Sequence, residues 1–376
     1  MVRPLCLTLL ATLPLAAQFA GLSLPPSGNN QKASVTQFIG PVKVTINYSS
    51  PAVHGPATPA GGPHVDRRGK IWGALVPYGL TDLAFGTSKQ APWRAGANEN
   101  TVFAVSEPVL IEGQPLAAGR YGFHIIVEAN EWTLIFSRNS TSWGSFFYDP
   151  TEDALRLKVK PHQHDYREYL TYEFLDRQPD EATAEMHWED LAVAWNIKVP
   201  KVNDIYLSRL RRELRDSTGF SSQAWVAAVQ YCLQANVNSE EALKWADYAI
   251  SGAFVGQTNF NTLSTKAQVL RRLNRVDEAK TLMRTALDLP ATTTFQIHQY
   301  GRQLLNANQN REALEVFAQN AKRFGEAWPT HFGLARGYAA TGDRVKALEH
   351  AKKALVQAPD APNKQALEAL IKTLSE

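Results

Sequence analysis

The sequence predicts two consecutive domains of different class, an all-β antiparallel sandwich or barrel followed by an all-α array of helical hairpins. Between about residues 33 and 199, apolar residues alternate with polar ones, which is typical of half-buried strands. Beyond about residue 204 the apolar spacing becomes helical, and alanines recur 34 residues apart at Ala279, Ala313 and Ala347. A chain of 376 residues that is 44% hydrophobic can form two separate cores.

The first residues predict a secretory signal peptide over residues 1–17. Arg3 supplies a positive charge, and an apolar run follows from residue 5 to residue 15. That run is shorter than the roughly 20 residues that a membrane span needs. We therefore expect cleavage after Ala17, export to the periplasm or the extracellular space, and a flexible mature N-terminus over residues 18–32.

Composition excludes several classes of protein. The chain has 39 Lys and Arg against 36 Asp and Glu, a formal net charge of +3, whereas a dedicated nucleic-acid binder normally carries a large basic surplus. Two cysteines exclude a disulfide scaffold and any multi-cysteine zinc module. Neither a GxGxxG nor a GxSxG motif occurs, so we expect no cofactor and no nucleic-acid partner.

The β half, residues 33–199, contains about ten short alternating runs separated by turn signals, among them residues 42–48, 121–127, 132–136, 155–159 and 186–199. Its aromatic side chains are expected in a core between two sheets. They are Trp132, Trp143, Phe146, Phe147, Tyr148, Trp188 and Trp195. Two segments rich in Pro, Gly and Ser, residues 51–70 and 80–92, interrupt the strand pattern and are expected to be loops.

The helical half begins with an expected linking helix over residues 200–218 and continues as repeats over residues 219–376. Polar residues stand where the second helix of each hairpin is expected to begin, as N-caps: Ser239, Asp277, Asn310 and Asp343. The last unit matches a known pattern at Leu334, Ala335, Tyr338, Gly342, Ala347, Ala354 and Pro359. The helical half therefore resembles a tetratricopeptide array of about four units over residues 220–361, the first of them shifted by about three residues. The resemblance implies stacked helical hairpins that bind a protein or peptide.

The β half carries motifs of a bacterial family. The matching segments are ASVTQFIG (33–40), VKVTINYSSPAVHG (42–55), IWGALVPYG (71–79), WRAGANENT (93–101), LAAGRYGFHII (116–126), EWTLIFS (131–137), WGSFFYD (143–149) and ALRLKVKP (154–161). With these motifs the β half, residues 33–199, resembles the domain of unknown function 2911 family. The resemblance implies a fold and an exported setting, and no assigned activity. Residues 80–92 depart from the family pattern as an insertion before the Trp-Arg pair, so access to a site at that junction would differ here.

The densest group of polar residues is the segment from Trp93 to Glu99. Arg94 offers a planar donor fork for a carboxylate or phosphate, and Trp93 offers a ring that can stack on a sugar. One interpretation is a pocket for a small anionic or sugar-like ligand. The other is a structural turn in which Arg94 and Glu99 pair with each other or with nearby backbone carbonyls. The candidate ligand-binding residues are Trp93, Arg94, Asn98, Glu99, Tyr48 and Tyr78.

Two histidines are weak candidates for a metal site. His162 and His164 lie two residues apart, so on a strand they would share one face. No carboxylate stands at a recognisable ligand offset beyond Asp165. We therefore expect exposed histidines at a strand end, and no metal.

These observations predict an exported, non-catalytic binding or scaffold protein. Its β domain would hold a small ligand or partner, and its repeats would serve protein–protein interaction. The alternative is a hydrolase or carbohydrate-active enzyme with a cleft around Arg94, Asn98 and Glu99. The position of Glu99 discriminates between them: an acid or histidine beside it favours the enzyme, whereas a pair with Arg94 under Trp93 favours a structural turn.

Overall fold

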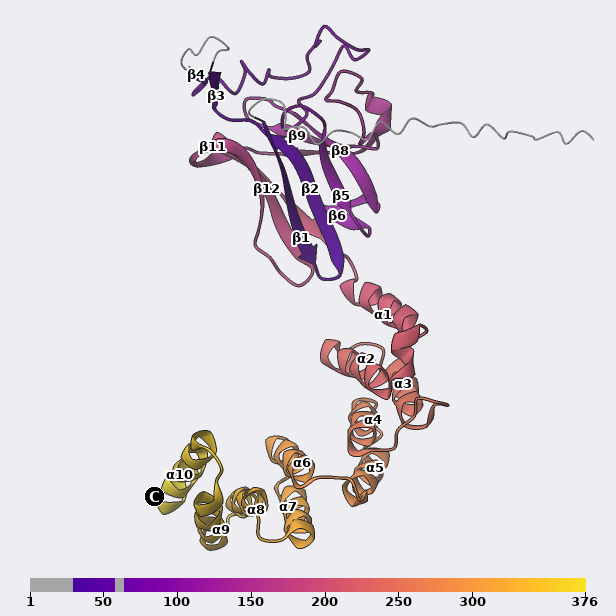
Figure 1. Ribbon diagram of the computed structural model, residues 1–376, viewed down its shortest axis with the longest axis vertical. Helices are drawn as coiled ribbons and strands as arrows, with labels where there is room; N and C mark the ends of the chain where they lie inside the picture. The colour runs from indigo at the N-terminus through magenta and orange to yellow at the C-terminus, as the bar shows by residue number, and fades with distance from the viewer. Residues whose placement is uncertain (1–29, 58–63) are drawn as a thin grey trace, which may run out of the picture. The chain divides into compact units, whose positions relative to one another are not determined.

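The computed structural model describes residues 30–57 and 64–376 (Figure 1). The expected signal peptide, its cleavage site after Ala17 and residues 18–29 lie outside the described residues. The described chain divides into two compact units, one ending at Val202 and the other running from Asn203 to Glu376.

The first unit is built of antiparallel sheets, as the sequence predicts. The larger sheet has the order β1-β2-β5-β8-β9-β10. Its strands are β1 (Gln31–Ile39), β2 (Val42–Ser50), β5 (Thr101–Val105), β8 (Gly119–Ile126), β9 (Trp132–Ser137) and β10 (Asp153–Val159). The second sheet has the order β11-β12-β6-β7, with β6 (Val109–Ile111), β7 (Gln114–Leu116), β11 (His162–Leu175) and β12 (Glu181–Lys198). A small hairpin pairs β3 (His54–Ala57) with β4 (His64–Asp66), so the prediction of a loop over residues 51–70 missed two short strands.

The two sheets pack face to face through the apolar residues of the alternating pattern. On β2, Val44 and Ile46 are buried, whereas Lys43 is exposed. Across the interface, the ring of Phe123 on β8 lies 5.2 Å from that of Trp195 on β12. The alternation therefore places one face of each strand in a shared sandwich core, as expected for this class.

The opposite face of β8 is also covered, which the alternation did not predict. Gly122 packs against the backbone oxygen of Asn139, and His124 is buried with its Nδ1 3.0 Å from the Ser145 hydroxyl. The segment between β9 and β10 thus lies over this face. Trp143 and Phe147 belong to this segment and are exposed, so the prediction that they lie in the core between the sheets is wrong.

The second unit is all helical. After α1 (Val202–Glu213) and a short 3-10 turn (Ser217–Phe220), nine helices follow among the described residues. They are α2 (Ser222–Ala235), α3 (Ser239–Ser251), α4 (Phe260–Arg272), α5 (Val276–Asp288), α6 (Thr294–Asn306), α7 (Asn310–Phe324), α8 (Trp328–Thr341), α9 (Arg344–Gln357) and α10 (Ala361–Ser375). None of the helices in the described ranges has the length and apolar character needed to cross a membrane.

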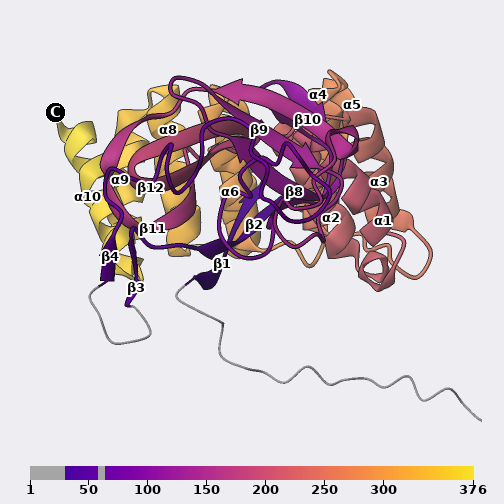
Figure 2. The same ribbon diagram turned by 90° about the horizontal axis from the view of Figure 1, so that it is seen from above.

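The helical pairs repeat with the predicted period. Helices α4, α6 and α8 begin 34 residues apart, and so do α5, α7 and α9. The pair α2–α3 begins 38 and 37 residues before α4 and α5, which agrees with the shift expected for the first unit. These are tetratricopeptide-like hairpins in chain order. Within this unit α2, α4 and α6 lie on the inner side of an arc, and α3, α5, α7 and α9 on its outer side (Figure 1). Figure 2 shows α8, α9 and α10 of the same unit side by side.

The expected N-caps are only partly right. Asp343 caps α9, accepting a hydrogen bond from the backbone N–H of Lys346. Ser239, Asp277 and Asn310 instead lie inside the first turn of α3, α5 and α7, because each of these helices begins one or two residues earlier than predicted. The sequence therefore predicts that these helices exist more reliably than it predicts the residue at which each begins.

Glycines allow neighbouring hairpins to approach closely around Phe317 of α7. A Cβ at Gly301 of α6 would lie 2.6 Å from Cζ of Phe317 and closer still to Cε1. A Cβ at Gly333 of α8 would lie 2.5 Å from Cδ1 of the same ring. The fully buried ring therefore fills the space between α6 and α8 that the two glycines leave.

Candidate functional site

The Trp93–Glu99 segment is pinned to the central strand of the larger sheet. The backbone N–H of Trp93 donates to Ile125 O at 2.9 Å, and the N–H of Ile125 donates to Trp93 O at 2.8 Å. The chain then turns through Ala95 and Asn98, whose φ angles are +52° and +58°. Positive φ is uncommon for residues other than glycine, so this turn is held by its surroundings. Gly96 serves a close approach instead, because a Cβ there would lie 2.8 Å from the Thr101 hydroxyl oxygen.

Arg94 is braced by backbone and aromatic rings. Its Nη1 donates to Asn98 O at 2.6 Å. Its Cζ lies 5.1 Å from the ring centroid of Phe146 and 5.4 Å from that of Trp143, distances at which cation–π attraction operates. A Cβ at Gly144 would lie 2.5 Å from Cζ of Arg94, so the 143–146 segment closes over the guanidinium.

The charge of Arg94 is not balanced by an acid in the described ranges. No carboxylate there lies within ion-pair distance of its guanidinium. Burial alone lowers the pKa of Arg94, and the side chain still carries its charge at neutral pH. Arg94 and Glu99 therefore do not pair with each other, whereas the bond from Arg94 to the backbone oxygen of Asn98 is one that a structural turn would also make.

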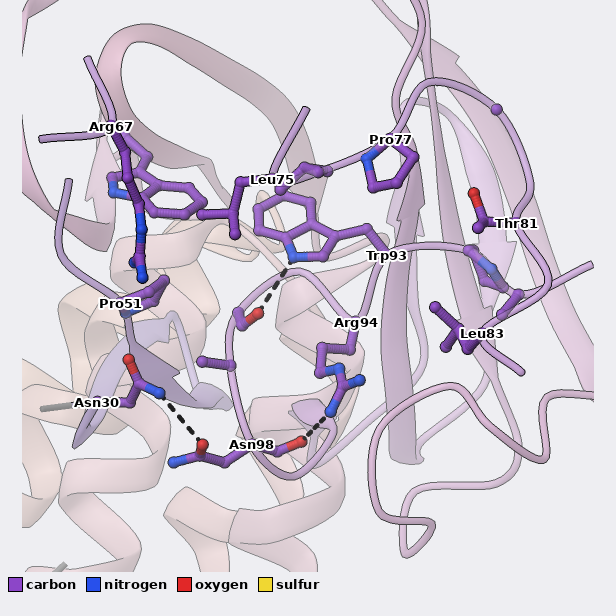
Figure 3. Close-up of a pocket in the computed structure, with 17 residues that line it drawn as sticks. Asn30, Pro51, Arg67, Leu75, Pro77, Thr81, Leu83, Trp93, Arg94 and Asn98 are labelled. Atoms are coloured by element: carbon purple, nitrogen blue, oxygen red, sulfur yellow. Dashed lines mark hydrogen bonds between the residues drawn. The ribbon is translucent and has the colours of Figure 1, made fainter. Parts of the chain in front are cut away.

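A cavity of about 380 Å³ lies beside this segment (Figure 3). Trp93, Arg94 and Asn98 line it. The indole of Trp93 stacks on that of Trp188 at 6.0 Å and donates from Nε1 to Gly96 O at 3.1 Å. The side-chain oxygen of Asn98 accepts a hydrogen bond from Asn30 at 3.2 Å. The cavity falls in the size range of small-molecule sites, about 300–1,000 Å³.

Both expected loops contribute to the wall of this cavity. The 51–70 segment supplies Pro51 and Arg67. The 80–92 segment supplies Thr81, Leu83, Ala91 and Pro92. Its two ends are held together by hydrogen bonds between the backbones of Thr81 and Ala91, at 2.9 and 3.1 Å. The insertion therefore borders the cavity, at the junction where the sequence predicts altered access.

The other three predicted site residues lie elsewhere. Glu99 and Tyr48 line a second hollow of about 370 Å³. There Glu99 pairs with Lys32 at 2.9 Å and accepts from the Ser49 hydroxyl at 3.3 Å; the Lys32 contact is the main reason that the pKa of Glu99 is lowered. Tyr78 is exposed, with its ring against Gly73. Of the six candidate residues, only Trp93, Arg94 and Asn98 line the first cavity.

The two weak metal candidates lie among other polar side chains of β11 and β12. His162 Nε2 is 3.2 Å from a carboxylate oxygen of Glu185, and the ring of His164 is 4.2 Å from that of His187. His162 is half-exposed, as expected, whereas His187 and Glu185 are buried. Burial is the main cause that lowers the pKa of His187 to about 4.

A cationic group lies on the helical unit where α6 and α8 contact each other. Arg336 of α8 is partly buried, with its Cζ 3.9 Å from the ring centroid of Phe332. Burial and, second, the positive charge of Arg302 on α6 lower the pKa of Arg336 to about 10. Burial and then Arg336 lower the pKa of nearby His298 to about 4. Within the described part of the chain, no carboxylate forms an ion pair with Arg302 or Arg336.

This group was not predicted from the sequence, although a signal for it is present there. Arg302 and Arg336 are 34 residues apart, which is the repeat period, and so are His298 and Phe332. Equivalent positions of consecutive repeats lie on the same face of the array. The repeat period alone therefore predicts that both arginines lie on the same face of neighbouring repeats.

Together these features define a β-sandwich domain with a lined cavity, followed by a tetratricopeptide-like helical array. The model of the family described as "Protein of unknown function (DUF2911)" matches residues 30–197. The resemblance predicted from the motifs of the β half is therefore confirmed. No curated protein matches the chain.

Three solved structures that match each cover less than half of this chain. MamA from Desulfovibrio magneticus RS-1 is 17% identical over 41% of this chain and 93% of its own, with a TM-score of 0.28. YrrB, described as a TPR protein with an unusual peptide-binding site, is 23% identical over 45% of this chain and 85% of its own, with a TM-score of 0.30. A tetratricopeptide repeat protein from Parabacteroides merdae ATCC 43184 is 14% identical over 46% of this chain and 66% of its own, with a TM-score of 0.31.

Proposed function

We propose that the chain is a non-catalytic binding or scaffold protein whose helical unit holds a carboxylate-bearing segment of a partner protein. The observation that carries this proposal is the pair of arginines at the contact of α6 and α8. Arg336 is partly buried beside a second cation, and no described acid pairs with either side chain. Two adjacent guanidinium groups repel each other, so an anionic ligand between them would remove an unfavourable interaction.

The surroundings of the pair favour a peptide over a lone ion. Phe295 of α6 is exposed, and its ring lies 5.9 Å from that of Trp328 on α8. Aromatic side chains beside arginines are the usual anchors of protein interfaces. The segment that binds is therefore expected to combine acidic side chains, or a C-terminal carboxylate, with an apolar residue.

Fluorescence anisotropy with designed peptides tests the proposal on the full chain. The probes are three labelled peptides of alternating charged and apolar residues, carrying Glu, Gln or Lys at the variable positions. Arg302→Met and Arg336→Met each remove one charge, and Arg311→Met removes an exposed arginine of α7 as the matched control. We expect the Glu peptide to bind best, to weaken about tenfold in each of the first two variants, and to bind the control as it binds the wild type. Equal binding of the Glu and Gln peptides, or unchanged binding by both arginine variants, would contradict the proposal.

The cavity of the β domain supports a second binding function, for a small anionic or sugar-like ligand. Trp93, Arg94 and Asn98 on its wall supply a ring, a charge and an amide. The enzyme alternative receives less support, because Glu99 contacts Lys32 and Ser49 and does not lie with Arg94 and Asn98. Thermal-shift screens with small carboxylates and monosaccharides test this function. Stabilisation of the wild type that Arg94→Lys abolishes is the expected result, since Lys lacks the planar fork.

Export forms the last part of the proposal and rests on the pattern of residues 1–17. N-terminal sequencing of protein recovered from outside the cytoplasm of an expressing bacterium tests it. A mature chain that begins at Gln18 is expected, whereas retention of Met1 in that fraction would contradict it.

A further inference from the structure

A cluster of histidines and carboxylates lies on the β11–β12 pair, apart from the cavity of Trp93. His162 and His164 lie two residues apart on β11, and Glu185 and His187 lie two residues apart on β12, so each pair shares one face of its strand. Glu173 pairs directly with Glu185 in the register of the two strands. Three imidazoles and two carboxylates therefore meet on one face of the four-stranded sheet.

Irregular pairing brings the two ends of β11 toward the same group. The register shifts between Gln163 and Arg167 and again between Arg167 and Thr171. Opposite Arg167, Glu189 of β12 has a φ of +58°. Bulges of this kind bend a strand and re-aim its side chains, and they are over-represented beside functional sites. Here they allow His164 to reach His187, although Thr171 is the residue of β11 that pairs with His187.

The distances within the cluster match those between ligands of one metal ion. One ligand atom each from His164, Glu185 and His187 lies within 4.8 Å of the others. His187 Nε2 lies 3.1 Å from Glu185 Oε1. Two ligand atoms of a tetrahedral zinc ion lie about 3.3 Å apart, because each is about 2.0–2.1 Å from the metal.

His187 provides a second and independent observation. Its side chain is 1% exposed, and neither of its ring nitrogens has a hydrogen-bond partner among the described residues. Oxygens of Glu173 and Glu185 are 2.6 and 3.1 Å from Nε2, but they do not meet the angular requirement of a hydrogen bond. A buried polar nitrogen without a partner requires an explanation, and a bound cation shared with these carboxylates supplies one.

Groups beside the cluster orient the His164 ring and offset part of the negative charge of the carboxylates. His164 Nδ1 lies 2.9 Å from Asp165 O, which it meets as a donor, so Nε2 is left with its lone pair. Metal-ligating histidines usually have such a bond on the second nitrogen. Arg167 lies 3.8 Å from Glu173 Oε1 and offsets the charge of that carboxylate. Glu185 then remains as the anionic ligand.

We propose that His164, Glu185 and His187 bind a divalent transition-metal ion of the zinc class, with His162 and Glu173 flanking it. Two imidazoles and one carboxylate are a zinc donor set, whereas calcium and magnesium prefer oxygen ligands throughout. The buried side chains of Glu185 and His187 form the floor of this site, and the half-exposed His162 leaves a path from solvent. Three protein ligands leave a coordination position for water or an anion.

Calorimetric titration of the full chain with zinc chloride, after removal of metal by a chelator, tests the proposal. The deciding variants are His164→Ala at the rim and Glu185→Gln, which keeps the shape of the side chain. They are preferred to a change at His187, whose burial makes it important for folding. The matched control is His64→Ala, which removes an exposed histidine of the same domain outside the cluster.

We expect one zinc ion per chain, an affinity at least about tenfold weaker in both deciding variants, and wild-type affinity in the control. Excess magnesium should not compete, and a cobalt-loaded chain should show a visible absorption band that His164→Ala removes. The proposal is overturned if the wild type binds no zinc at micromolar concentration, or if the deciding variants bind it as the wild type does. Equal loss of affinity in His64→Ala, or displacement by magnesium, would likewise overturn it.

Discussion

Replacing Arg336 with methionine should stabilise the helical unit while it weakens peptide binding. Methionine is unbranched and has nearly the helix propensity of arginine, so it can follow the same path over Phe332 without a charge. Functional residues are often placed at a cost in stability, and Arg336 has the features of such a residue.

The size of the effect follows from the surroundings of the guanidinium. The pKa of Arg336 is about 10, against more than 12 for an exposed arginine, and the side chain is charged at pH 7 in both the folded and the unfolded chain. Each pKa unit corresponds to about 1.4 kcal/mol, so burial and Arg302 oppose folding by about 3 kcal/mol. The contact of the guanidinium with the Phe332 ring at 3.9 Å offsets about 1–2 kcal/mol of this cost, because the position is partly desolvated. The expected net gain in the variant is therefore about 1–2 kcal/mol.

Urea unfolding of the full chain, followed by circular dichroism at the helical minimum, measures this gain. All α-helices of the described ranges belong to the second unit, so the signal reports on that unit. Arg311→Met on α7 should stay within about 0.5 kcal/mol of the wild type, as surface changes usually do. A loss of stability of more than about 1 kcal/mol in Arg336→Met would refute the reasoning, because it would mean that the charge is satisfied within the folded chain.

Three further changes have defined outcomes. Gly301→Ala should lower the free energy of unfolding by about 1–3 kcal/mol, because its Cβ would overlap the ring of Phe317; a rise, as helix propensity alone predicts, would contradict this. The pKa of His298 is about 4 in the folded chain and near 6.5 in the unfolded chain, so between these pH values only the unfolded chain binds a proton at this residue. Acidification from pH 7 to 5 should therefore lower the free energy of unfolding of the wild type by about 2 kcal/mol more than that of His298→Gln. Parallel pH profiles of the two proteins would contradict this prediction. Arg94→Ala should destabilise the β domain by about 1–3 kcal/mol through loss of its bond to Asn98 O and its ring contacts, and a melting temperature equal to that of the wild type would show that Arg94 does not hold the loop.

The period of the sequence was enough to predict most elements of both halves, but not the short strands β3 and β4 within residues 51–70. Strand alternation at Val44 and Ile46, and the 34-residue alanine spacing, both follow from which side chains must be buried. The N-caps could not be predicted as well, because the polar neighbours Asn238 and Gln309 occupy the N-cap positions of α3 and α7, although their side chains make no capping hydrogen bond. Local polarity alone does not choose between adjacent residues.

Site residues were harder to predict, because they meet through tertiary contacts. Trp93, Arg94 and Asn98 form one local segment, and their common position on the cavity could be expected from that. Trp143 was assigned to the core for its size, although it stacks on Arg94 from a segment almost fifty residues away. His187 lies more than twenty residues from His164, and only the bulges of β11 bring their rings together.

The backbone bonds between Thr81 and Ala91 separate the insertion from the sandwich that carries it. Residues can be gained, lost or exchanged between these two anchors without disturbing a ladder bond of either sheet. Since Leu83 inside this segment and Ala91 at its end both line the cavity, such changes alter the wall of the cavity directly. The shape of the cavity can therefore change through this segment alone, while the strands that fold the domain stay the same.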